Sequence, residues 1–418
     1  MQKLLVRSNN QSLKGSVKIS GAKNAAVAII PAAVLTAAPV RIENLPDIKD
    51  IQILRKILDS LGVQTDWQDG TMNINSSTAF SSETTYEEVK KLRASYYLLG
   101  ALTGRFGRAV VPVPGGCDLG PRPIDQHIKG LTALGANIEV EHGLIKVETS
   151  QLKGADIYLD VVSVGATINI MLAAVRAKGK TVIENSAKEP EIVDVANFLN
   201  AMGAHIRGAG TDVIRITGVS ELSGVNHSVI PDRIEAGTYM IAAAATRGDV
   251  LICDVIPKHL DPVTAKLREM GITVDVADDQ IRVMAHNQPQ AVDIKTFPYP
   301  GFPTDLQSLA MILLTQANGN SIITENVFEG RFKHVDELKR MGAHIKVEGR
   351  TAIIEGPCQL TGAPVKATDL RAGAAFILAG LLAQGDTVIS EIGHIYRGYE
   401  NICEKFNSLG ANICEIDD

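Results

Sequence analysis

The sequence predicts an α/β protein built from six repeats of about 70 residues, arranged as two domains of three repeats each. Two short phrases recur in phase along the chain, and each repeat begins with a helix that is apolar on every side. Self-similarity at a fixed period is the signature of a duplicated structural unit. A helix without a polar face has to be buried. We therefore expect these helices inside each domain, with strands and a second, amphipathic helix packed around them.

The first phrase consists of an apolar residue, a glycine, a small residue, a variable residue and often Ile or Val. Its glycines are separated by 73, 68, 68, 71 and 68 residues. Glycine adopts the left-handed conformation at little steric cost and commonly follows a helix end, so each phrase predicts the end of an outer helix. The glycines are Gly62, Gly135, Gly203, Gly271, Gly342 and Gly410.

The second phrase is a glycine followed by β-branched residues, which predicts that the inner helix ends and a strand begins. Close copies start at Gly179, Gly248, Gly319 and Gly385, and weaker copies start at Pro39 and Gly107. In the third repeat we expect Gly179 to cap the inner helix. Two independent markers that keep one phase indicate a genuine repeat.

The third repeat illustrates the expected order of elements. An apolar helix over residues 166–177 precedes a strand over 181–183, and an amphipathic helix over 192–202 follows. Two short strands, over residues 205–207 and 213–216, complete the unit. The polar face of the second helix places it outside the first.

Composition and charge are those of an ordinary globular protein. The chain is 45% apolar and 21% charged with a net charge of −6, which argues against disorder and against a nucleic-acid-binding surface. An anionic ligand is not excluded, because clustered Lys and Arg can dominate the field in a cleft. Aromatic residues make up only 4%, so Gly and small apolar residues must fill much of the core and elements can pack closely.

The sequence favours a soluble cytoplasmic protein. The N-terminus lacks the features of a signal peptide. The longest apolar run, residues 25–38, contains Pro31 and is shorter than the roughly 20 residues that a membrane span needs, so we expect a buried helix there. The five widely spaced cysteines give neither a disulfide framework nor a zinc pattern. We expect no metal, no cofactor and no nucleic-acid partner.

Polar or glycine-rich phrases precede each inner helix, and charged residues recur in them. Helix N-termini carry unpaired N–H groups and a partial positive charge, so they bind anions. Added Lys and Arg would make a strong anion site, whereas an acidic residue such as Asp305 is common there on dipole grounds alone. The marker residues are Lys23, Arg93, Gly165, Glu235, Asp305 and Arg371.

Further basic residues begin the outer helices, namely Lys49, Arg122, Arg331 and Arg397. Lys405 lies on the last outer helix. Taken singly, each is expected to be a solvated surface charge.

The segment 113–123 contains three glycines and three prolines, too many for a helix or a strand. Such loops are often functional. Cys117 has polar neighbours and lies close in sequence to Arg122, conditions that lower the pKa of a thiol. Cys117 is therefore the candidate reactive cysteine, and the other four are expected to be inert.

Several of these motifs together resemble the UDP-N-acetylglucosamine 1-carboxyvinyltransferase family, and the resemblance covers essentially the whole chain. The resemblance implies an inside-out α/β barrel with two pseudo-threefold domains. It also implies transfer of the enolpyruvyl group of phosphoenolpyruvate to the 3-hydroxyl of UDP-N-acetylglucosamine, the first committed step of peptidoglycan synthesis. The matching segments are 20–25, 114–117, 120–125, 163–167, 231–238, 300–305 and 328–332.

The resemblance also implies two lobes and the positions of the site. Residues 23–229 would form an N-terminal lobe that carries the Cys117 loop, and residues 1–22 with 230–418 a C-terminal lobe. Phosphoenolpyruvate would be bound by Lys23, Asn24, Arg93, Arg122, Arg371 and Arg397. UDP-N-acetylglucosamine would be bound by Asn24, Arg93, Arg122, Pro123, Ile124, Asp125, Gln126, Ser163, Val164, Gly165, Asp305 and Val327. Some family members carry a Lys where this chain has Val161, which affects one diphosphate contact.

Cys117, Asp305, Lys23 and Arg397 are the expected catalytic residues. Asp305 would take the hydroxyl proton of the acceptor, and Lys and Arg side chains would stabilise the developing charge and the leaving phosphate. Cys117 would lie on a lid that closes over the ligands. It would act as a general acid or form a covalent adduct with phosphoenolpyruvate, and it would be alkylated by fosfomycin.

Two other functions remain open from the sequence. One is an enzyme like 5-enolpyruvylshikimate-3-phosphate synthase, whose acceptor carries one phosphate rather than a uridine diphosphate. The other is a non-catalytic paralogue that binds a UDP-sugar and regulates another protein. Phosphate release with each acceptor distinguishes the two enzymes, and tight binding without phosphate release would indicate the paralogue.

Overall fold

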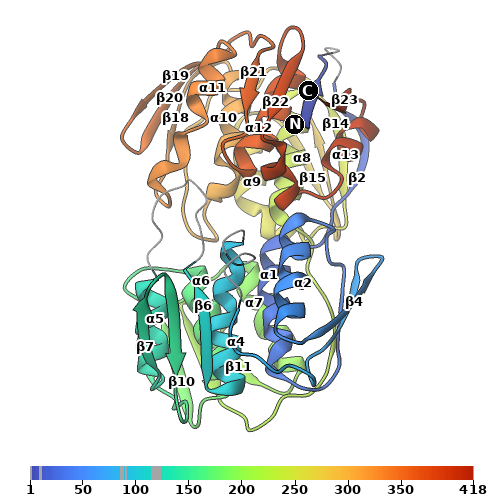
Figure 1. The fold of residues 1–418 in the computed structure, drawn as a ribbon. Coiled ribbons are helices and arrows are strands. Elements are labelled where there is room, and N and C mark those ends of the chain that lie inside the picture. Colours follow the sequence, from blue (N-terminus) through green and yellow to red (C-terminus); the bar gives the residue numbers. More distant parts are fainter. Residues whose placement is uncertain (1, 9–11, 85–88, 90–91, 114–123, 418) are drawn as a thin grey trace. The chain divides into compact units, whose positions relative to one another are not determined.

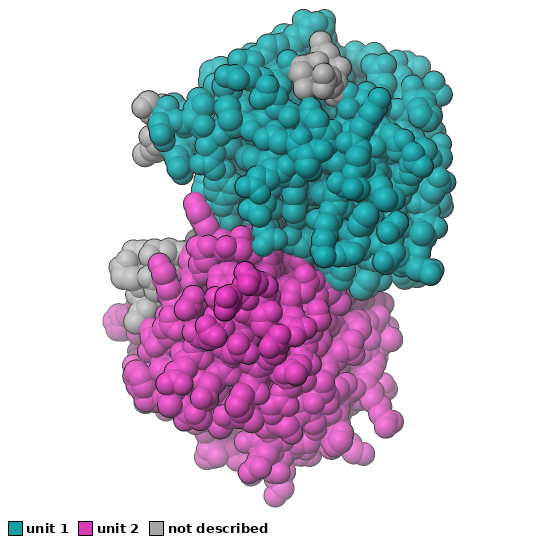
Figure 2. Space-filling model, turned by 90° about the vertical axis from the view of Figure 1, so that its right-hand side faces the viewer, with its two compact units in different colours: residues 1–20, 118–120, 231–418 teal, residues 21–117, 121–230 magenta. Residues whose placement is uncertain are grey.

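The computed structural model describes residues 2–8, 12–84, 89, 92–113 and 124–417, which fold into two compact units (Figures 1 and 2). Of the described residues, unit 1 contains 2–8, 12–20 and 231–417, and unit 2 contains 21–84, 89, 92–113 and 124–230. The expected lobes agree with these units except at residues 21, 22 and 230. They were expected in the lobe that corresponds to unit 1, and the structure assigns them to unit 2. Each unit has its own apolar core.

The third repeat shows the architecture that all six share. It consists of β9 (Asp156–Tyr158), α6 (Val164–Ala174), β10 (Lys180–Glu184), α7 (Pro190–Ala201), β11 (His205–Arg207) and β12 (Val213–Thr217). These strands form a sheet in the order β11-β12-β10-β9, in which β9 pairs parallel to β10 and the other pairs are antiparallel. The predicted order of elements is confirmed. Strand β9 was missed, because three residues with one buried side chain show no readable periodicity.

Unit 2 contains two further repeats. The first comprises α1 (Lys23–Ala32), η1 (Ala33–Leu35), β3 (Val40–Glu43), α2 (Lys49–Ser60), β4 (Gln64–Gln68) and β5 (Thr71–Asn75). The second comprises η2 (Arg93–Tyr96), α4 (Tyr97–Phe106), β6 (Arg108–Pro112), α5 (Asp125–Ala133), β7 (Asn137–Glu141) and β8 (Leu144–Glu148). Its sheet has three strands, and an isolated parallel bridge from Glu83 to Val110 occupies the place of the fourth.

Unit 1 contains three repeats of the same plan. The fourth comprises α8 (Arg233–Ala245), β14 (Asp249–Cys253), η3 (Pro257–Leu260), α9 (Asp261–Glu269), β15 (Thr273–Val276) and β16 (Gln280–Met284). The fifth comprises β17 (Ile294–Lys295), η4 (Thr304–Leu306), α10 (Gln307–Thr315), β18 (Gly319–Thr324), η5 (Glu329–Phe332), α11 (Val335–Arg340), β19 (His344–Glu348) and β20 (Thr351–Gly356). The sixth comprises β21 (Pro364–Lys366), α12 (Leu370–Leu382), β22 (Thr387–Ser390), η6 (Ile392–Arg397), α13 (Ile402–Ser408) and β23 (Ile413–Ile416).

Three strands belong to the sheets of repeats that are distant from them in the sequence. Strand β2 (Lys14–Lys18) precedes α1 but pairs with β14 of the fourth repeat. Strand β13 (Asn226–Ser228) precedes α8 but pairs with β3 of the first repeat. Strand β1 (Lys3–Val6) lies between β22 and β23 of the sixth repeat. The first, fourth and sixth repeats are therefore completed by segments that the repeat pattern alone does not assign to them.

The first helix of each repeat is buried, as predicted. Every residue of α6 from Ala166 to Ala174 and every residue of α12 from Arg371 to Leu381 is buried. In unit 2, α1, α4 and α6 run side by side (Figure 1). Gly100 and Gly104 let α4 approach α6 closely, because a Cβ on Gly100 would lie 2.3 Å from the Asn169 carbonyl oxygen. The expected close packing through small residues is confirmed.

The six glycines of the first phrase all have positive φ, between 82° and 101°. Their predicted role at the ends of the outer helices is confirmed. The second phrase is less regular. Gly179 is left-handed, but α6 ends earlier and its C-cap is Val175, so the prediction that Gly179 caps this helix is wrong. In the fourth repeat Arg247 adopts the left-handed conformation, and Gly248 makes room for the Leu13 carbonyl.

The apolar run over residues 25–38 lies in α1 and η1. The helical structure ends at Leu35, so it is shorter than the run. Within the described part of the chain, none of the helices combines the length and apolar character that crossing a membrane requires.

Candidate active site

Unit 1 brings charged side chains together at the N-termini of its three inner helices. Arg233 is the first residue of α8, Asp305 lies in η4 directly before α10, and Arg371 is the second residue of α12. Two of these helices have an aspartate N-cap: the Asp232 carboxylate accepts hydrogen bonds from two backbone N–H groups of α8, and Asp369 does the same on α12. The equivalence of the repeats therefore places charged residues at equivalent helix ends.

The Asp305 carboxylate is held between two arginines. Nη2 of Arg331 donates to Oδ1 at 2.8 Å, and Nη2 of Arg371 donates to Oδ2 at 3.1 Å. The two arginine side chains are only 3% and 4% exposed, whereas the Asp305 side chain is 26% exposed. The prediction that Arg331 is a solvated surface charge is wrong, because η5 directs its side chain toward Asp305.

This arrangement controls the charge of the carboxyl group. Burial opposes ionisation of Asp305, but the positive charges of Arg371 and Arg331, with a further contribution from Arg233, outweigh burial and hold the pKa of Asp305 well below its usual value. Burial likewise disfavours the charged form of Arg371, but Asp305 outweighs it and raises the pKa of the guanidinium. Asp305 is therefore a firmly ionised carboxylate.

Arg371 lies beside Tyr399, and one of its guanidinium nitrogens has no hydrogen-bond partner among the described residues. Its guanidinium carbon lies 5.3 Å from the ring centroid of Tyr399, and the Tyr399 hydroxyl is 2.9 Å from Thr238 Oγ1. Nη1 of Arg371 is buried and has no hydrogen-bond partner among the described residues. A buried donor of this kind favours an acceptor on a ligand.

Glu325 fixes the segments on either side of Asp305. This residue is fully buried, and its carboxylate accepts a hydrogen bond from Thr304 Oγ1 at 2.9 Å. It also accepts from the backbone N–H groups of Val327 and Phe328 at 2.8 and 3.0 Å. The position of Val327 is thereby coupled to the start of η4. Sequence reasoning missed Glu325, although an acidic or amide residue ends several other copies of the second phrase.

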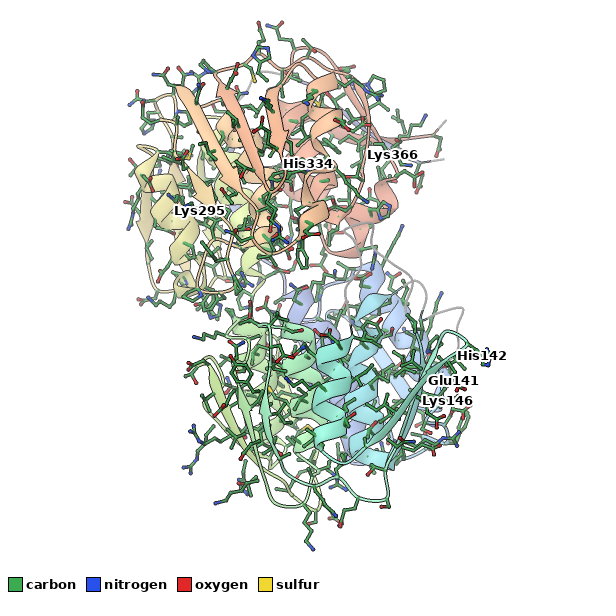
Figure 3. All side chains as sticks on the ribbon, turned by 90° about the vertical axis from the view of Figure 1, so that its left-hand side faces the viewer. Glu141, His142, Lys146, Lys295, His334 and Lys366 are labelled. Atoms are coloured by element: carbon green, nitrogen blue, oxygen red, sulfur yellow. The ribbon has the colours of Figure 1, made fainter. Side chains whose placement is uncertain are left out.

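His334, labelled in Figure 3, is the N-cap residue of α11 and lies between η5 and that helix in the chain. Its imidazole is buried, and Nδ1 lies 3.0 Å from the carbonyl oxygen of Arg331. Burial lowers the pKa of His334 to about 4, with Asp369 opposing and Arg331 reinforcing the effect. The imidazole is therefore neutral at physiological pH.

Glu235, the fourth helix-start marker, forms an ion pair away from Asp305. Its carboxylate is 2.6 Å from Lys405 Nζ and accepts the N–H of Ser20 at 2.8 Å. Lys405 also donates to Ser20 Oγ at 2.7 Å, and Ser20 Oγ donates to Glu400. The prediction that Lys405 is a surface charge is wrong, because its side chain is 17% exposed and bonded to a carboxylate that is 3% exposed. Burial raises the pKa of Glu235 to about 7, against the effect of Lys405.

In unit 2, Lys23 and Asn24 begin α1. Nζ of Lys23 lies 3.0 Å from Oδ2 of Asp50, whose side chain is 1% exposed. Asp50 lies in the first turn of α2, so the starts of an inner and an outer helix are joined by this ion pair. Sequence reasoning missed Asp50, because an acidic residue in a first helical turn is common for dipole reasons alone.

The N-terminus of α6 contains the predicted residues Ser163, Val164 and Gly165. Ser163 is the N-cap, and its hydroxyl accepts the N–H of Ala166 at 3.3 Å. A Cβ on Gly165 would lie 3.0 Å from Nε2 of His127. The His127 ring is in turn bonded to Asn169, 2.7 Å from its side-chain amide. The helix start is thus packed tightly against α5, and a side chain at position 165 would require the His127 ring to shift.

The start of α5 lies beside the segment that leads to α6. Oε1 of Gln126 accepts the N–H of Asp160 at 2.9 Å, and its amide donates to Asp160 Oδ2 at 3.1 Å. Lys129 donates to the other oxygen of Asp160 at 2.7 Å. The predicted residues 124–126 and 163–165 are therefore brought close together within unit 2. Val161, the departure from the family pattern, is 58% exposed.

Other predicted positions are described only in part or not at all. Cys117, Arg122 and Pro123 lie outside the described residues. Arg93 is the first residue of η2, and Arg397 is the last residue of η6 and partly exposed. The residues that the structure describes contain no group of three or more His, Cys, Asp or Glu side chains that could hold a metal ion.

Comparison with known proteins identifies close relatives. A family model described as EPSP synthase (3-phosphoshikimate 1-carboxyvinyltransferase) matches residues 8–406. UDP-N-acetylglucosamine 1-carboxyvinyltransferase 2 of Geobacillus kaustophilus (strain HTA426) is 60% identical over 401 residues, which are 96% of this chain and 94% of that protein. UDP-N-acetylglucosamine 1-carboxyvinyltransferase of Clostridium botulinum (strain ATCC 19397 / Type A) is 58% identical over 418 residues, the full length of both chains.

Solved structures share the fold. The enolpyruvyl transferase NikO from Streptomyces tendae has a TM-score of 0.90 at 27% identity, covering 99% of this chain and 98% of that one. EPSP synthase from Acinetobacter baumannii has a TM-score of 0.77 at 21% identity over the whole of both chains. The second likeness concerns the fold alone. Together these similarities confirm the predicted α/β architecture of two three-repeat domains.

Proposed function

The chain belongs to the enolpyruvyl transferase family that the EPSP synthase model describes, and we propose that it transfers the enolpyruvyl group of phosphoenolpyruvate to the 3-hydroxyl of UDP-N-acetylglucosamine. Phosphate is released, and the reaction is the first committed step of peptidoglycan synthesis. Relatives that carry the name of this activity are 56–60% identical over nearly the full chain, which supports this acceptor. The observation that supports the chemistry is a carboxylate, Asp305, held among arginines at the N-termini of inner helices.

The proposed reaction is an addition followed by an elimination. Asp305 takes the proton of the acceptor hydroxyl while the oxygen attacks C2 of phosphoenolpyruvate and C3 gains a proton. The resulting tetrahedral ketal then loses phosphate as C3 gives up a proton. General-base catalysis of this kind is worth typically about 10²–10⁴-fold in rate. Fixed cations stabilise the carboxylate and phosphate oxygens of the reactant throughout.

Phosphoenolpyruvate is assigned to Lys23, Asn24, Arg93, Arg122, Arg371 and Arg397. The buried ion pair with Asp50 supports the role of Lys23, because it fixes the ammonium group at the start of α1. The unused Nη1 of Arg371 supports the role of that residue. Both groups offer hydrogen bonds to anionic oxygens from preorganised positions.

UDP-N-acetylglucosamine is assigned to Asn24, Arg93, Arg122, Pro123, Ile124, Asp125, Gln126, Ser163, Val164, Gly165, Asp305 and Val327. The bonds between Gln126 and Asp160 support the grouping of residues 124–126 with the start of α6. A helix N-terminus suits a diphosphate, because its first backbone N–H groups have no partners within the helix. The hydrogen bonds that Glu325 accepts from Val327 and Thr304 support a shared role for Val327 and Asp305.

Cys117 completes the proposed catalytic set with Lys23, Asp305 and Arg397. We assign it to a lid loop, as a general acid or as the site of a covalent adduct with phosphoenolpyruvate, and as the target of fosfomycin. Replacing it with Ser is expected to abolish covalent labelling by fosfomycin. Labelling at another residue would contradict this assignment of the loop.

Phosphate release with each acceptor tests the function. The purified protein with phosphoenolpyruvate is expected to release phosphate when UDP-N-acetylglucosamine is added and not when shikimate 3-phosphate is added. Turnover with shikimate 3-phosphate alone would overturn the acceptor assignment, since the family model itself carries the name of that activity. Tight binding of UDP-N-acetylglucosamine without phosphate release would indicate a regulatory protein instead. We assign the reaction to the cytoplasm, where the four described cysteines would remain free thiols.

A further inference from the structure

We infer that Glu235 and Lys405 are positioning residues, which hold the connection that leads into α1 and hold it more firmly when Glu235 is ionised. The inference rests on the proposed function, in which Lys23 and Asn24 at the start of α1 bind the reactants. Neither Glu235 nor Lys405 is assigned a contact with a reactant, so both act on the reaction through the backbone that they hold.

The connection consists of residues 19–22, between strand β2 and helix α1. The chain passes from unit 1 into unit 2 within this connection, after Ser20. Gly21 and Ala22 alone separate Ser20 from Lys23. Ser20 is therefore the point at which unit 1 holds the chain before α1 begins.

Unit 1 engages every polar group of Ser20. The N–H donates to Oε2 of Glu235 at 2.8 Å, and the carbonyl oxygen accepts the N–H of Asp232 at 2.9 Å. The hydroxyl oxygen accepts from Nζ of Lys405 at 2.7 Å, and the hydroxyl group donates to Glu400. These partners belong to the fourth and sixth repeats, so two repeats fix Ser20 together.

The Glu235 carboxylate serves two partners at once. Oε1 lies 2.6 Å from Nζ of Lys405, and Oε2 accepts the N–H of Ser20. The Glu235 and Lys405 side chains are 3% and 17% exposed, so water competes little for these bonds. A hydrogen bond to an ionised acceptor is roughly twice as strong as one between neutral groups. The hold on Ser20 therefore depends on the charge of Glu235.

Glu235 changes its charge close to neutral pH. Burial raises its pKa to about 7, Lys405 opposes the shift, and Asp232 at the N-cap of α8 adds to it. The other titratable groups of the cluster are Tyr239 on the same helix and Glu400 before α13. Both charge states of Glu235 are therefore populated near neutral pH.

The Ser20 bond and the ionisation of Glu235 favour each other. Burial raises the pKa of Glu235, but the N–H of Ser20 acts against this rise. By reciprocity, the ionised carboxylate holds the N–H more firmly than the neutral acid does. The hold is therefore strongest above about pH 7 and weakens as the pH falls through that value. Global unfolding depends on pH in the opposite sense, because it transfers Glu235 to water.

The rest of the connection leaves little room for adjustment. A Cβ on Gly21 would lie 1.7 Å from the carbonyl oxygen of Asn44, and the N–H of Ala22 donates to the carbonyl of Ile230 at 2.7 Å. Closely packed backbone transmits a displacement instead of absorbing it. Misplacement of a positioning group by about 1 Å can cost about 10²-fold in rate, so a small displacement of Ser20 that reaches the start of α1 is enough to affect turnover.

Serine-selective ¹⁵N labelling tests the hold on Ser20 independently of activity. The Ser20 amide signal is identified by its loss in Ser20→Ala. Its proton is expected to move downfield as the pH rises through about 7, because the N–H then donates to a carboxylate. In Glu235→Gln the signal is expected to stay constant, since the glutamine amide resembles the neutral acid. A Ser20 signal that is constant in the wild type, or that titrates equally in both proteins, would overturn the inference.

Lys405→Met tests the pair from its other member. Lys405 opposes the rise in the pKa of Glu235, so its removal is expected to move the Ser20 transition to higher pH by at least about one unit. Lys405→Arg is expected to leave the transition near that of the wild type, because the positive charge remains. A transition at unchanged pH in Lys405→Met would contradict the pairing and the inference with it.

Turnover provides the readout for positioning. The ratio of kcat/KM for phosphoenolpyruvate between wild type and Glu235→Gln is expected to be close to one at about pH 6 and to reach about fivefold at about pH 8, the difference between a charged and a neutral acceptor. Taking the ratio removes the titration of the reactant itself. The matched control Glu269→Gln removes a Lys–Glu pair of 2.7 Å from α9, and its ratio to the wild type is expected to be independent of pH.

These readouts separate the failure of the inference from the failure of the proposed function. If the wild-type protein releases no phosphate with UDP-N-acetylglucosamine but Ser20 titrates as expected, the proposed function fails and the hold of Glu235 on Ser20 stands. If turnover occurs with a ratio that does not change with pH, Glu235 and Lys405 are merely structural and the inference is overturned.

Discussion

At the scale of single residues, two acidic side chains at the inner-helix starts of unit 1 are ion-paired but differ in acid–base character. Asp305 lies between two arginines, which hold its pKa well below the usual value. Glu235 has one cationic partner, Lys405, and burial raises its pKa to about 7. The difference follows from the number of positive charges that oppose desolvation. Equivalent positions in two repeats have thereby acquired different properties.

Replacing Glu235 with Gln is expected to change how stability depends on pH. Because the pKa of Glu235 is higher in the folded state than in the unfolded state, its contribution to stability is fully present below about pH 4.5 and is lost as the pH rises through about 7. The slope is at most about 1.4 kcal/mol per pH unit. The difference in free energy of unfolding between wild type and variant, measured from pH 4.5 to 8, is expected to show this slope.

The exposed Glu404 supplies the control for that measurement, and Glu404→Gln is expected to show no comparable slope. Taking the difference from wild type also removes the effect of His334. Its lowered pKa acts in the opposite sense, because stability is lost as the pH falls from 6.5 toward 4. A pH-independent difference for Glu235→Gln would contradict the proposed ionisation.

At the scale of elements, small residues determine how closely the inner helices pack. On α4, Gly100 and Gly104 stand one turn apart and face α6, where the Asn169 and Leu172 carbonyls lie too close for any Cβ. Gly104 also faces Leu35 at the end of η1, so one glycine serves the contacts to two neighbouring inner helices. The short separation lets the buried Asn169 side chain accept the N–H of Gly100 at 2.7 Å.

Gly100→Ala is expected to destabilise unit 2. The added methyl group would lie 2.3 Å from a backbone oxygen of α6, so the two helices must separate, and overpacking of this kind costs about 1–3 kcal/mol. Denaturant unfolding measures the effect. Lys56→Ala, on the exposed face of α2, is expected to change the free energy of unfolding by less than about 0.5 kcal/mol. If Gly100→Ala unfolded with the same free energy as the wild type, α4 would be able to move away from α6 at no cost in stability.

At the scale of the whole molecule, repeats are completed by segments from distant parts of the chain. β1 lies between β22 and β23, and both Leu4 and Val6 are fully buried in the core of unit 1. β2 and β13 each pair with the repeat that does not follow them in sequence. These pairings mean that unit 1 depends on residues at both ends of the chain, whereas the described residues of unit 2 all lie between residues 21 and 230.

A truncation that begins at Ser8 is expected to destabilise unit 1 selectively. It removes a central strand and two buried side chains, each worth about 1.5–3 kcal/mol of burial. Hydrogen exchange is expected to show lost protection in β22, β23 and α12, while α4 and α6 of unit 2 remain protected. Arg7→Ala, at an exposed position, is the control. Equal loss of protection in both units would show that they unfold as a single cooperative unit.

The sequence by itself determined the six repeats, the burial of their first helices and the six left-handed glycines. Each of these depends on local periodicity or on the conformational freedom of one residue, and both can be read along a single segment. The sequence also predicted correctly that charged residues, from Lys23 to Arg371, lie at the starts of the inner helices.

Only the tertiary structure decided which of these charges meet. Arg331 and Lys405 read as surface residues, because nothing in their neighbourhood along the chain indicates that Asp305 and Glu235 lie beside them. The exchange of β2 and β13 was equally hidden, since β13 has only three residues and β2 buries only one of five, so neither shows a readable periodicity and packing chooses the partner of each. Pairing between distant segments depends on the folded geometry. A repeat pattern therefore predicts the structure of each repeat more reliably than it predicts which terminal strands complete which sheet.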